Sequence, residues 1–145
     1  MAGQTGTWVT PYCWQPFDEL LRAADIVSLH VPATPATYHL VDARALALMK
    51  PAAILINTAR GSVVDEAALV AALAADRLYG AGLDVAEHEP HLAPQLLGHP
   101  RVVITPHLGG GTVESRHAAR AHAVANVAAV LQGKPPHQPL NHPHR

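Results

Sequence analysis

Four short runs of consecutive apolar residues recur along the chain, separated by longer stretches with helical spacing. The runs cover residues 26–31, 53–57, 80–85 and 102–105. Each run is apolar at successive positions rather than at alternate ones, which is typical of strands covered on both faces. Because strands that alternate with helices need crossover connections, the pattern predicts an α/β fold with a parallel sheet.

The stretches between these runs predict helices with recognisable ends. The first helix is expected over residues 17–24, and Asp42 and Asp65 are each placed to cap a later one. The last helix is expected to begin near Thr112 and to end at Gly133. The Val and Leu positions on these helices are expected to lie in the core: Leu46, Leu69, Leu73, Val124, Val127 and Leu131.

The organisation predicted along the chain has three parts. Residues 1–16 are irregular, with one strand at residues 7–10, and residues 17–133 form the α/β domain. Within this domain, residues 90–100 have no clear period and are expected to form a loop. Residues 134–145 are a Pro- and His-rich tail. No internal repeat and no long linker divides the chain.

Composition excludes several classes of protein. The chain of 145 residues is long enough for one domain with a core, and its net charge of −1 argues against nucleic-acid and membrane-surface partners. The single cysteine, Cys13, excludes an internal disulfide and fits a cytoplasmic setting. We expect no bound metal, because the segment His88–His91 is one residue short of the H-E-x-x-H zinc spacing and contains a proline.

Three residues with complementary chemistry each follow one of the predicted strands, namely Arg60, Glu89 and His107. In an open α/β sheet, groups just beyond the carboxyl ends of neighbouring strands border one ligand-binding crevice. A cation, a carboxylate and an imidazole gathered there could orient an anionic substrate and transfer a proton. Each residue also has a simpler explanation: an Arg paired with a nearby acid, a solvated loop Glu, and a His in a loop that caps a helix.

Two further segments have the same ambiguity. Asp84 closes the third predicted strand, where its carboxylate could accept a hydrogen bond from a cofactor amide or cap the following turn. Residues 30–37 follow the first strand, where they could border a cofactor or form a rigid Pro-containing turn. Gly109 and Gly110, next to His107, permit close backbone approach by a ligand.

These segments together resemble the D-isomer-specific 2-hydroxyacid dehydrogenase family over roughly residues 17–141. The run Met49–Glu66, with its Asn57-Thr58-Ala59-Arg60-Gly61 segment, is especially characteristic. The run Gly80–Val85 and the compact loop from Glu89 to Pro100 are most similar to the glyoxylate/hydroxypyruvate reductase branch, as is Gly133-Lys134-Pro135-Pro136.

The resemblance implies hydride transfer between NAD or NADP and a small 2-oxo or 2-hydroxy acid. Arg60 would hold the substrate carboxylate, His107 would exchange a proton with the substrate oxygen, and Glu89 would favour the protonated imidazole. Asp84 would bind the nicotinamide carboxamide. The full set expected at the cofactor is His30, Val31, Pro32, Thr58, Ala59, Arg60, Asp84, His107, Gly109 and Gly110.

The chain also departs from the family pattern. It contains no G-x-G-x-x-G segment, so the first strand and the Gly-rich loop of a Rossmann-type, doubly wound sheet are expected to be missing. Ala86 stands where an aromatic residue is common. The sequence therefore predicts a truncated dehydrogenase with little activity alone, in a homodimer or paired with a missing amino-terminal half. The alternatives are a non-catalytic interaction module and one half of a split enzyme.

Overall fold

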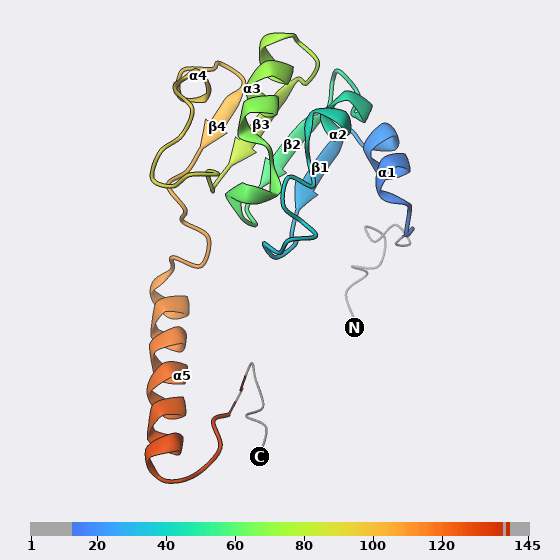
Figure 1. The fold of residues 1–145 in the computed structure, drawn as a ribbon. Helices are drawn as coiled ribbons and strands as arrows, with labels where there is room; N and C mark the ends of the chain where they lie inside the picture. The colour runs from blue at the N-terminus through green and yellow to red at the C-terminus, as the bar shows by residue number, and fades with distance from the viewer. Residues whose placement is uncertain (1–12, 138, 140–145) are drawn as a thin grey trace, which may run out of the picture. The chain divides into compact units, whose positions relative to one another are not determined.

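The computed structural model describes residues 13–137 and residue 139. The strand expected at residues 7–10 lies outside the described residues, as do most of the irregular segment and of the tail. The chain divides into two compact units, Met1–Pro106 and His107–Arg145 (Figure 1).

The first unit is a parallel sheet whose strands alternate with helices. The four strands lie in the order β1-β2-β3-β4 and all neighbouring pairs are parallel. The α/β fold class is therefore confirmed. In chain order the elements are α1 (Phe17–Ala23), β1 (Ile26–Leu29), α2 (Ala43–Leu48), β2 (Ile54–Asn57), a 3-10 helix, η2 (Gly61–Val63), α3 (Glu66–Ala74), β3 (Gly80–Leu83), α4 (Pro94–Leu97) and β4 (Val102–Ile104).

The core of the first unit lies between one face of the sheet and helices α1, α2 and α3. Strand register aligns Val27, Leu55 and Ala81 in one buried row across β1, β2 and β3. Leu69 and Leu73 of α3 are buried in the same cluster, as predicted. Burying these side chains removes apolar surface from water, and this is the main favourable term for the fold.

The opposite face of the sheet differs from the expectation of strands covered on both sides. Ile26 on β1 is 59% exposed and Val103 on β4 is 69% exposed. Each connection leads from one strand to its neighbour, always in the same direction across the sheet. Because crossovers between parallel strands are right-handed, α2 and α3 lie on the same face of the sheet (Figure 1). Helices α2 and α3 therefore leave the opposite face of the described sheet uncovered at Ile26 and Val103.

Local signals placed the helix ends correctly. The Asp42 carboxylate accepts a hydrogen bond of 2.8 Å from Ala45 N, and the Asp65 carboxylate accepts one of 2.9 Å from Ala68 N. The loop expected at residues 90–100 contains one helical turn, α4, which the sequence analysis missed. Pro94 at its start favours that turn and Leu96 is buried within it.

The described part of the second unit forms one helix, α5 (Val113–Leu131). Its predicted start is confirmed, because the Thr112 hydroxyl accepts a hydrogen bond of 3.2 Å from Ser115 N. The expectation that its apolar positions lie in the core is wrong: Val124, Val127 and Leu131 are 68%, 59% and 82% exposed. A single helix has no second element in its own unit against which to bury an apolar stripe. Among the described residues, no helix is both long and apolar enough to cross a membrane.

Candidate active site

Polar segments leave β2 and β3 side by side at the carboxyl edge of the sheet. Asn57 ends β2 and is the register partner of Leu83, which ends β3. The backbone N–H of Asp84 donates a hydrogen bond of 3.0 Å to the carbonyl oxygen of Asn57. The Arg60 turn and the segment that leads to Glu89 therefore begin next to each other, as the parallel topology predicts.

The turn that presents Arg60 is shaped by Asn57, whose side chain is buried beneath it. Its amide oxygen accepts a hydrogen bond of 3.0 Å from Ala59 N, and its amide nitrogen donates one of 3.0 Å to the Arg60 carbonyl oxygen. The Arg60 side chain is exposed, and its Nη1 atom donates a bond of 2.6 Å to the Ala59 carbonyl oxygen. A guanidinium has five N–H donors in a planar fork, which suits two-point binding of a carboxylate.

Gly61 brings this turn into direct contact with the following loop. A Cβ atom placed on Gly61 would lie 1.8 Å from the carbonyl oxygen of Ala86 and 2.5 Å from the backbone nitrogen of Glu87. No side chain fits at such distances, so only glycine permits this approach. The contact holds the segment after β2 against the one after β3.

Asp84 is a buried carboxylate at the end of β3. It is 7% exposed, and the Thr105 hydroxyl at the end of β4 donates a short hydrogen bond to its Oδ1 atom. Thr105 itself continues the β4 pairing, because its backbone N–H donates a bond of 2.9 Å to the Leu83 carbonyl oxygen. Thr105 was not predicted as a site residue; its position at the end of the fourth apolar run was the available signal.

The predicted cofactor segment His30–Pro32 follows β1 at the same edge of the sheet. The His30 ring lies 2.8 Å from the Ser28 hydroxyl. The Thr37 hydroxyl donates a hydrogen bond of 2.6 Å to the Pro32 carbonyl oxygen and holds the turn closed. The turn chemistry considered for this segment is therefore present, and its contact with a cofactor stays a prediction.

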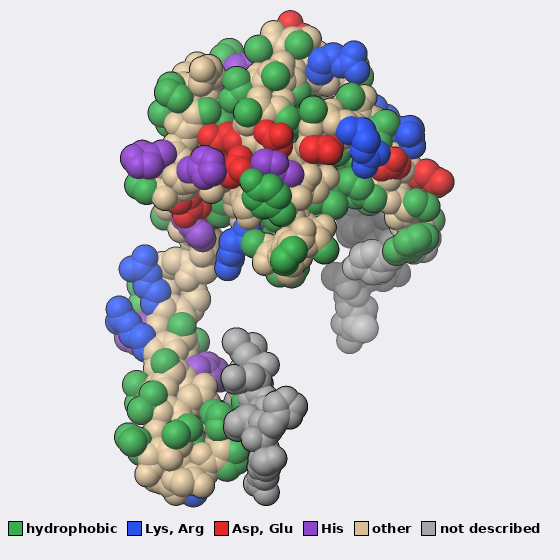
Figure 2. Space-filling model, viewed as in Figure 1, with side chains coloured by type: hydrophobic (Ala, Val, Ile, Leu, Met, Phe, Trp, Pro, Cys, Tyr) green, Lys and Arg blue, Asp and Glu red, His purple; other side chains and the backbone are tan. Residues whose placement is uncertain are grey.

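Glu87, rather than Glu89, is the buried carboxylate of the loop that follows β3. The Glu87 side chain is 9% exposed and its Oε1 atom lies 2.6 Å from His39 Nε2. The exposed Glu89 accepts a bond of 3.2 Å from Ala86 N. Figure 2 shows acidic and histidine side chains gathered in a band across this face of the first unit.

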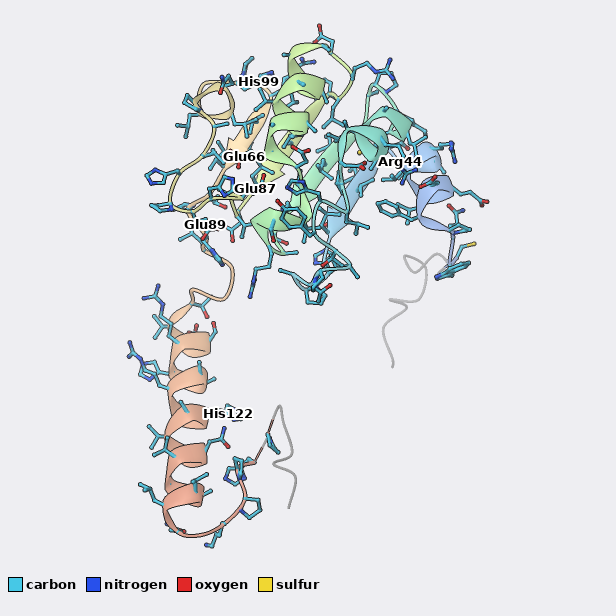
Figure 3. The ribbon with its side chains drawn as sticks, viewed as in Figure 1. Arg44, Glu66, Glu87, Glu89, His99 and His122 are labelled. Atoms are coloured by element: carbon cyan, nitrogen blue, oxygen red, sulfur yellow. The ribbon has the colours of Figure 1, made fainter. Side chains whose placement is uncertain are left out.

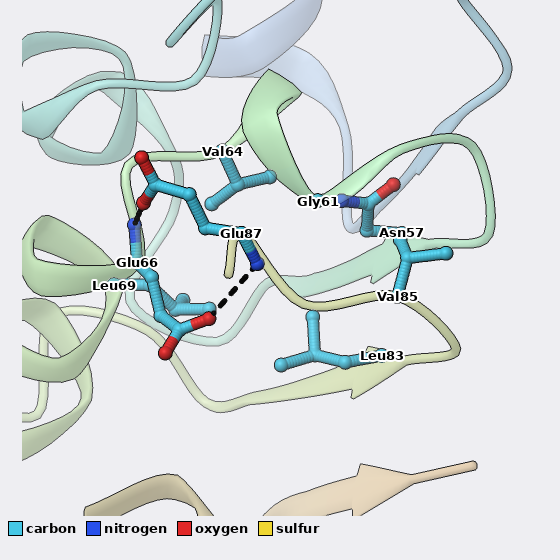
Figure 4. Close-up of a pocket in the computed structure, with 8 residues that line it drawn as sticks. All are labelled: Asn57, Gly61, Val64, Glu66, Leu69, Leu83, Val85 and Glu87. Carbon is cyan, nitrogen blue, oxygen red and sulfur yellow. Dashed lines mark hydrogen bonds between the residues drawn. The ribbon is translucent and has the colours of Figure 1, made fainter. Parts of the chain in front are cut away.

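Two residues of this cluster, Glu66 and Glu87, are joined through their backbones as well. The Glu87 carboxylate accepts a hydrogen bond of 3.1 Å from Glu66 N, and the Glu66 carboxylate accepts one of 3.2 Å from Glu87 N (Figure 4). Glu66, Glu87 and His39 were not among the residues predicted from the sequence. Their contacts join residues 21 and 48 positions apart, so no local pattern indicated them.

The pKa of Glu87 is set by opposing effects. Burial raises it, but hydrogen bonds from His39 and from the backbone N–H of Glu66, with the positive charge of protonated His39 and His88, hold it below the ordinary value of 4.5. The contribution of the ionised carboxylate to stability is therefore present above pH 4.5 and is lost as the pH falls through the lower pKa of the folded state.

We expect Glu87→Gln to lower the free energy of unfolding by about 1.5–3 kcal/mol at pH 7, because a hydrogen bond to a charged group is removed. The deficit relative to the unaltered chain should shrink as the pH falls below 4.5, since the carboxylate then becomes neutral in both states. Urea unfolding at pH 7, 5 and 3.5 measures it, with the exposed Glu19→Gln as control. A deficit that does not depend on pH would contradict the electrostatic explanation.

His107, Gly109 and Gly110 belong to the second unit. His107 has a left-handed backbone, with φ of 51°, and Gly110 has φ of 75°. The loop is closed by a hydrogen bond of 2.8 Å from Gly111 N to the Leu108 carbonyl oxygen, and the Ser115 hydroxyl donates one of 2.7 Å to the Gly110 carbonyl oxygen. The structure thus brings Arg60, Asp84 and Glu89 to one edge of the sheet in the first unit, and holds His107 at the start of the second.

The sequence of the chain matches a known family. The profile of the D-isomer specific 2-hydroxyacid dehydrogenase, NAD binding domain, matches residues 6–109. The chain belongs to this family. The resemblance drawn from the sequence is therefore confirmed. Proteins of this family bind NAD or NADP through this domain.

Two similar proteins carry names of the reductase branch that the sequence indicated. Glyoxylate reductase of Thermococcus litoralis is 45% identical over 125 residues, which are 86% of this chain and 38% of that protein. Glyoxylate/hydroxypyruvate reductase B of Enterobacter agglomerans is 47% identical over 124 residues, or 85% of this chain and 38% of that protein. The chain thus spans 38% of the length of each of these relatives.

Solved structures of the family share the fold. An NADPH-dependent glyoxylate/hydroxypyruvate reductase from Sinorhizobium meliloti, in complex with NADP and malonate, superposes with a TM-score of 0.77 at 40% identity, over 79% of this chain and 36% of that one. The holo D-mandelate dehydrogenase of Rhodotorula graminis gives a TM-score of 0.83 at 39% identity, over 89% and 38%. The parallel sheet described above therefore matches part of a Rossmann-type NAD-binding domain.

Proposed function

We propose that this chain supplies the catalytic residues of an NAD(P)-dependent 2-hydroxyacid dehydrogenase that acts on a small 2-oxo acid such as glyoxylate or hydroxypyruvate. The observation that supports it best is the contact at Gly61, which holds the Arg60 turn against the loop of Glu89 at the carboxyl edge of a parallel sheet. That edge is where ligands bind in open α/β folds. The names of the relatives support the substrate class.

The described residues fit the nicotinamide end of the cofactor. A carboxylate has about four acceptor positions, so Asp84 can serve both Thr105 and the N–H donors of a carboxamide. His30, Val31 and Pro32 would line the groove beside it, and Thr58 and Ala59 would border it from the β2 end. The described residues contain no G-x-G-x-x-G turn between a strand and a helix, the arrangement typical of a pyrophosphate site. The bound nicotinamide would supply or accept a hydride at C2 of the substrate.

The side chains of this chain would then bind the substrate carboxylate and transfer the proton. The Arg60 guanidinium binds the substrate carboxylate through paired hydrogen bonds and polarises the carbonyl group. The protonated His107 ring donates its proton to the carbonyl oxygen during reduction and takes it back during oxidation. The Glu89 carboxylate favours the protonated ring, because a nearby opposite charge stabilises the cation.

A second possibility is that the chain works as one half of a split enzyme. Among the described strands, β1 lies at an edge of the sheet, and its apolar Ile26 is 59% exposed. An exposed apolar edge strand favours pairing with another strand. On this view the isolated chain turns over little or no substrate, and a separate polypeptide completes the cofactor site.

A chimeric enzyme tests the proposal. Residues 13–137 would replace the aligned segment of the Enterobacter agglomerans reductase B, which is 47% identical. We expect the chimera to oxidise NADH or NADPH with glyoxylate or hydroxypyruvate, and the chain alone to show no steady turnover. A chimera that folds and binds the cofactor without turnover would contradict the catalytic proposal and favour a non-catalytic interaction module.

A further inference from the structure

The loop that holds Glu89 is a short, closed excursion from the sheet. It runs from Glu87, four residues after the end of β3, to Ala93, immediately before α4. At its tip, His88 and His91 form an antiparallel bridge, with a hydrogen bond of 2.8 Å from His91 N to the His88 carbonyl oxygen. The position of Glu89 therefore depends on what holds the two ends of this loop.

Both ends of the loop are bound to a single carboxylate, that of Glu66. Its Oε2 atom accepts a hydrogen bond of 3.2 Å from Glu87 N, and its Oε1 atom accepts one of 2.6 Å from Ala93 N. Each oxygen thus binds one end of the loop. Glu66 is the first residue of α3, and the neighbouring Asp65 already caps that helix by accepting from Ala68 N. The Glu66 carboxylate is thus directed at the loop rather than at its own helix.

The same contact is reinforced from the side of the loop. Glu87 accepts a hydrogen bond of 3.1 Å from Glu66 N, and its other oxygen binds His39 at 2.6 Å. The Glu87 side chain is only 9% exposed, and hydrogen bonds shielded from water are stronger than those at an open surface. Figure 3 shows Glu66 and Glu87 together beside α3, with Glu89 further along the same loop.

We propose that Glu66 is a positioning residue for Glu89. Its carboxylate clamps both ends of the loop by accepting hydrogen bonds from Glu87 N and Ala93 N, and the Glu87 carboxylate accepts one from Glu66 N. This inference rests on the role proposed for Glu89. The side chain of Glu89 is exposed and accepts a bond of 3.2 Å from Ala86 N, so its place follows the backbone of the loop. Without the Glu66 carboxylate, the loop keeps its tip turn and the bond from Glu66 N to the Glu87 carboxylate, but Glu87 N and Ala93 N lose their acceptor.

Amide hydrogen exchange in the whole 145-residue chain tests the clamp without any cofactor. Glu66→Ala should accelerate exchange at Glu87 N and Ala93 N by about 10–100-fold, the effect of losing a hydrogen bond to a charged acceptor. Glu66→Gln keeps one acceptor oxygen and should accelerate one of the two amides more than the other. Glu19→Gln, an exposed carboxylate on α1, is the matched control. Unchanged exchange at both amides, or equal acceleration throughout the first unit, would overturn the proposal.

The chimera described above gives the functional readout. There, Glu66→Gln should lower kcat and alter its pH dependence, because the pairing proposed for Glu89 and the proton donor depends on the position of the loop, while KM for the 2-oxo acid stays unchanged. A loosened loop with an unaltered kcat and pH profile would overturn the positioning role. An inactive parent chimera would count against the proposed function alone, since the exchange experiment measures the clamp independently.

Discussion

Gly61→Ala should be among the most damaging single substitutions in the first unit. The added Cβ would lie 1.8 Å from the Ala86 carbonyl oxygen, so the backbone of one of the two segments must shift. We expect the free energy of unfolding to fall by about 1–3 kcal/mol or more, the usual cost of forcing atoms into a packed site. Urea unfolding of the purified chain measures this effect.

Gly98→Ala is the matched control for this prediction. A Cβ on Gly98 meets nothing within 4 Å, so the same chemical change there should leave stability within about 0.5 kcal/mol. Equal effects of the two substitutions would contradict the close contact at Gly61. In the chimera, Gly61→Ala should also lower turnover, because the Arg60 turn and the Glu89 loop are no longer held together.

His107→Asn should have the largest effect on chemistry. If His107 is the proton donor in carbonyl reduction, its loss should lower kcat of the chimera by about 10²–10⁴-fold, the usual contribution of general acid–base catalysis. Asparagine approximates the size of the ring near the backbone but does not exchange protons near neutral pH. Stopped-flow or steady-state oxidation of the reduced nicotinamide measures this loss.

The control for His107 is another exposed histidine of the same unit, His117 on α5. His117→Asn should leave kcat within about twofold if only His107 transfers the proton. A His107→Asn chimera with kcat near that of the parent would contradict the assignment. Retained affinity for the reduced cofactor in that variant would show that the fold is intact.

Local signals in the sequence determined most of the fold of the first unit. Consecutive apolar residues such as those of Ile54–Ile56 predicted parallel strands, because such runs are typical of parallel sheets. Asp42 and Asp65 predicted the starts of α2 and α3, because a cap acts on amides only three positions away. The position of Arg60 and Glu89 at one edge of the sheet then followed from the parallel topology.

The sequence pattern misjudged which apolar residues would be buried. Val124 and Leu131 have the spacing of a core-facing stripe, yet both are exposed on α5. Periodicity shows that a helix has an apolar face but not that another element covers it. Ile26 on β1 is exposed for a related reason, because right-handed crossovers place α2 and α3 on the opposite face of the sheet.

The support beneath the candidate site was decided by tertiary structure alone. Asn57, with its side chain buried beneath the Arg60 turn, and Glu66, which binds both ends of the Glu89 loop, make polar contacts that no periodicity signals. The partners of Glu66 lie 21 and 27 residues further along the chain. The sequence by itself thus determined the family, the sheet and the residues with candidate chemistry. Which side chains hold these candidate residues in place depends on contacts that form only when the chain folds.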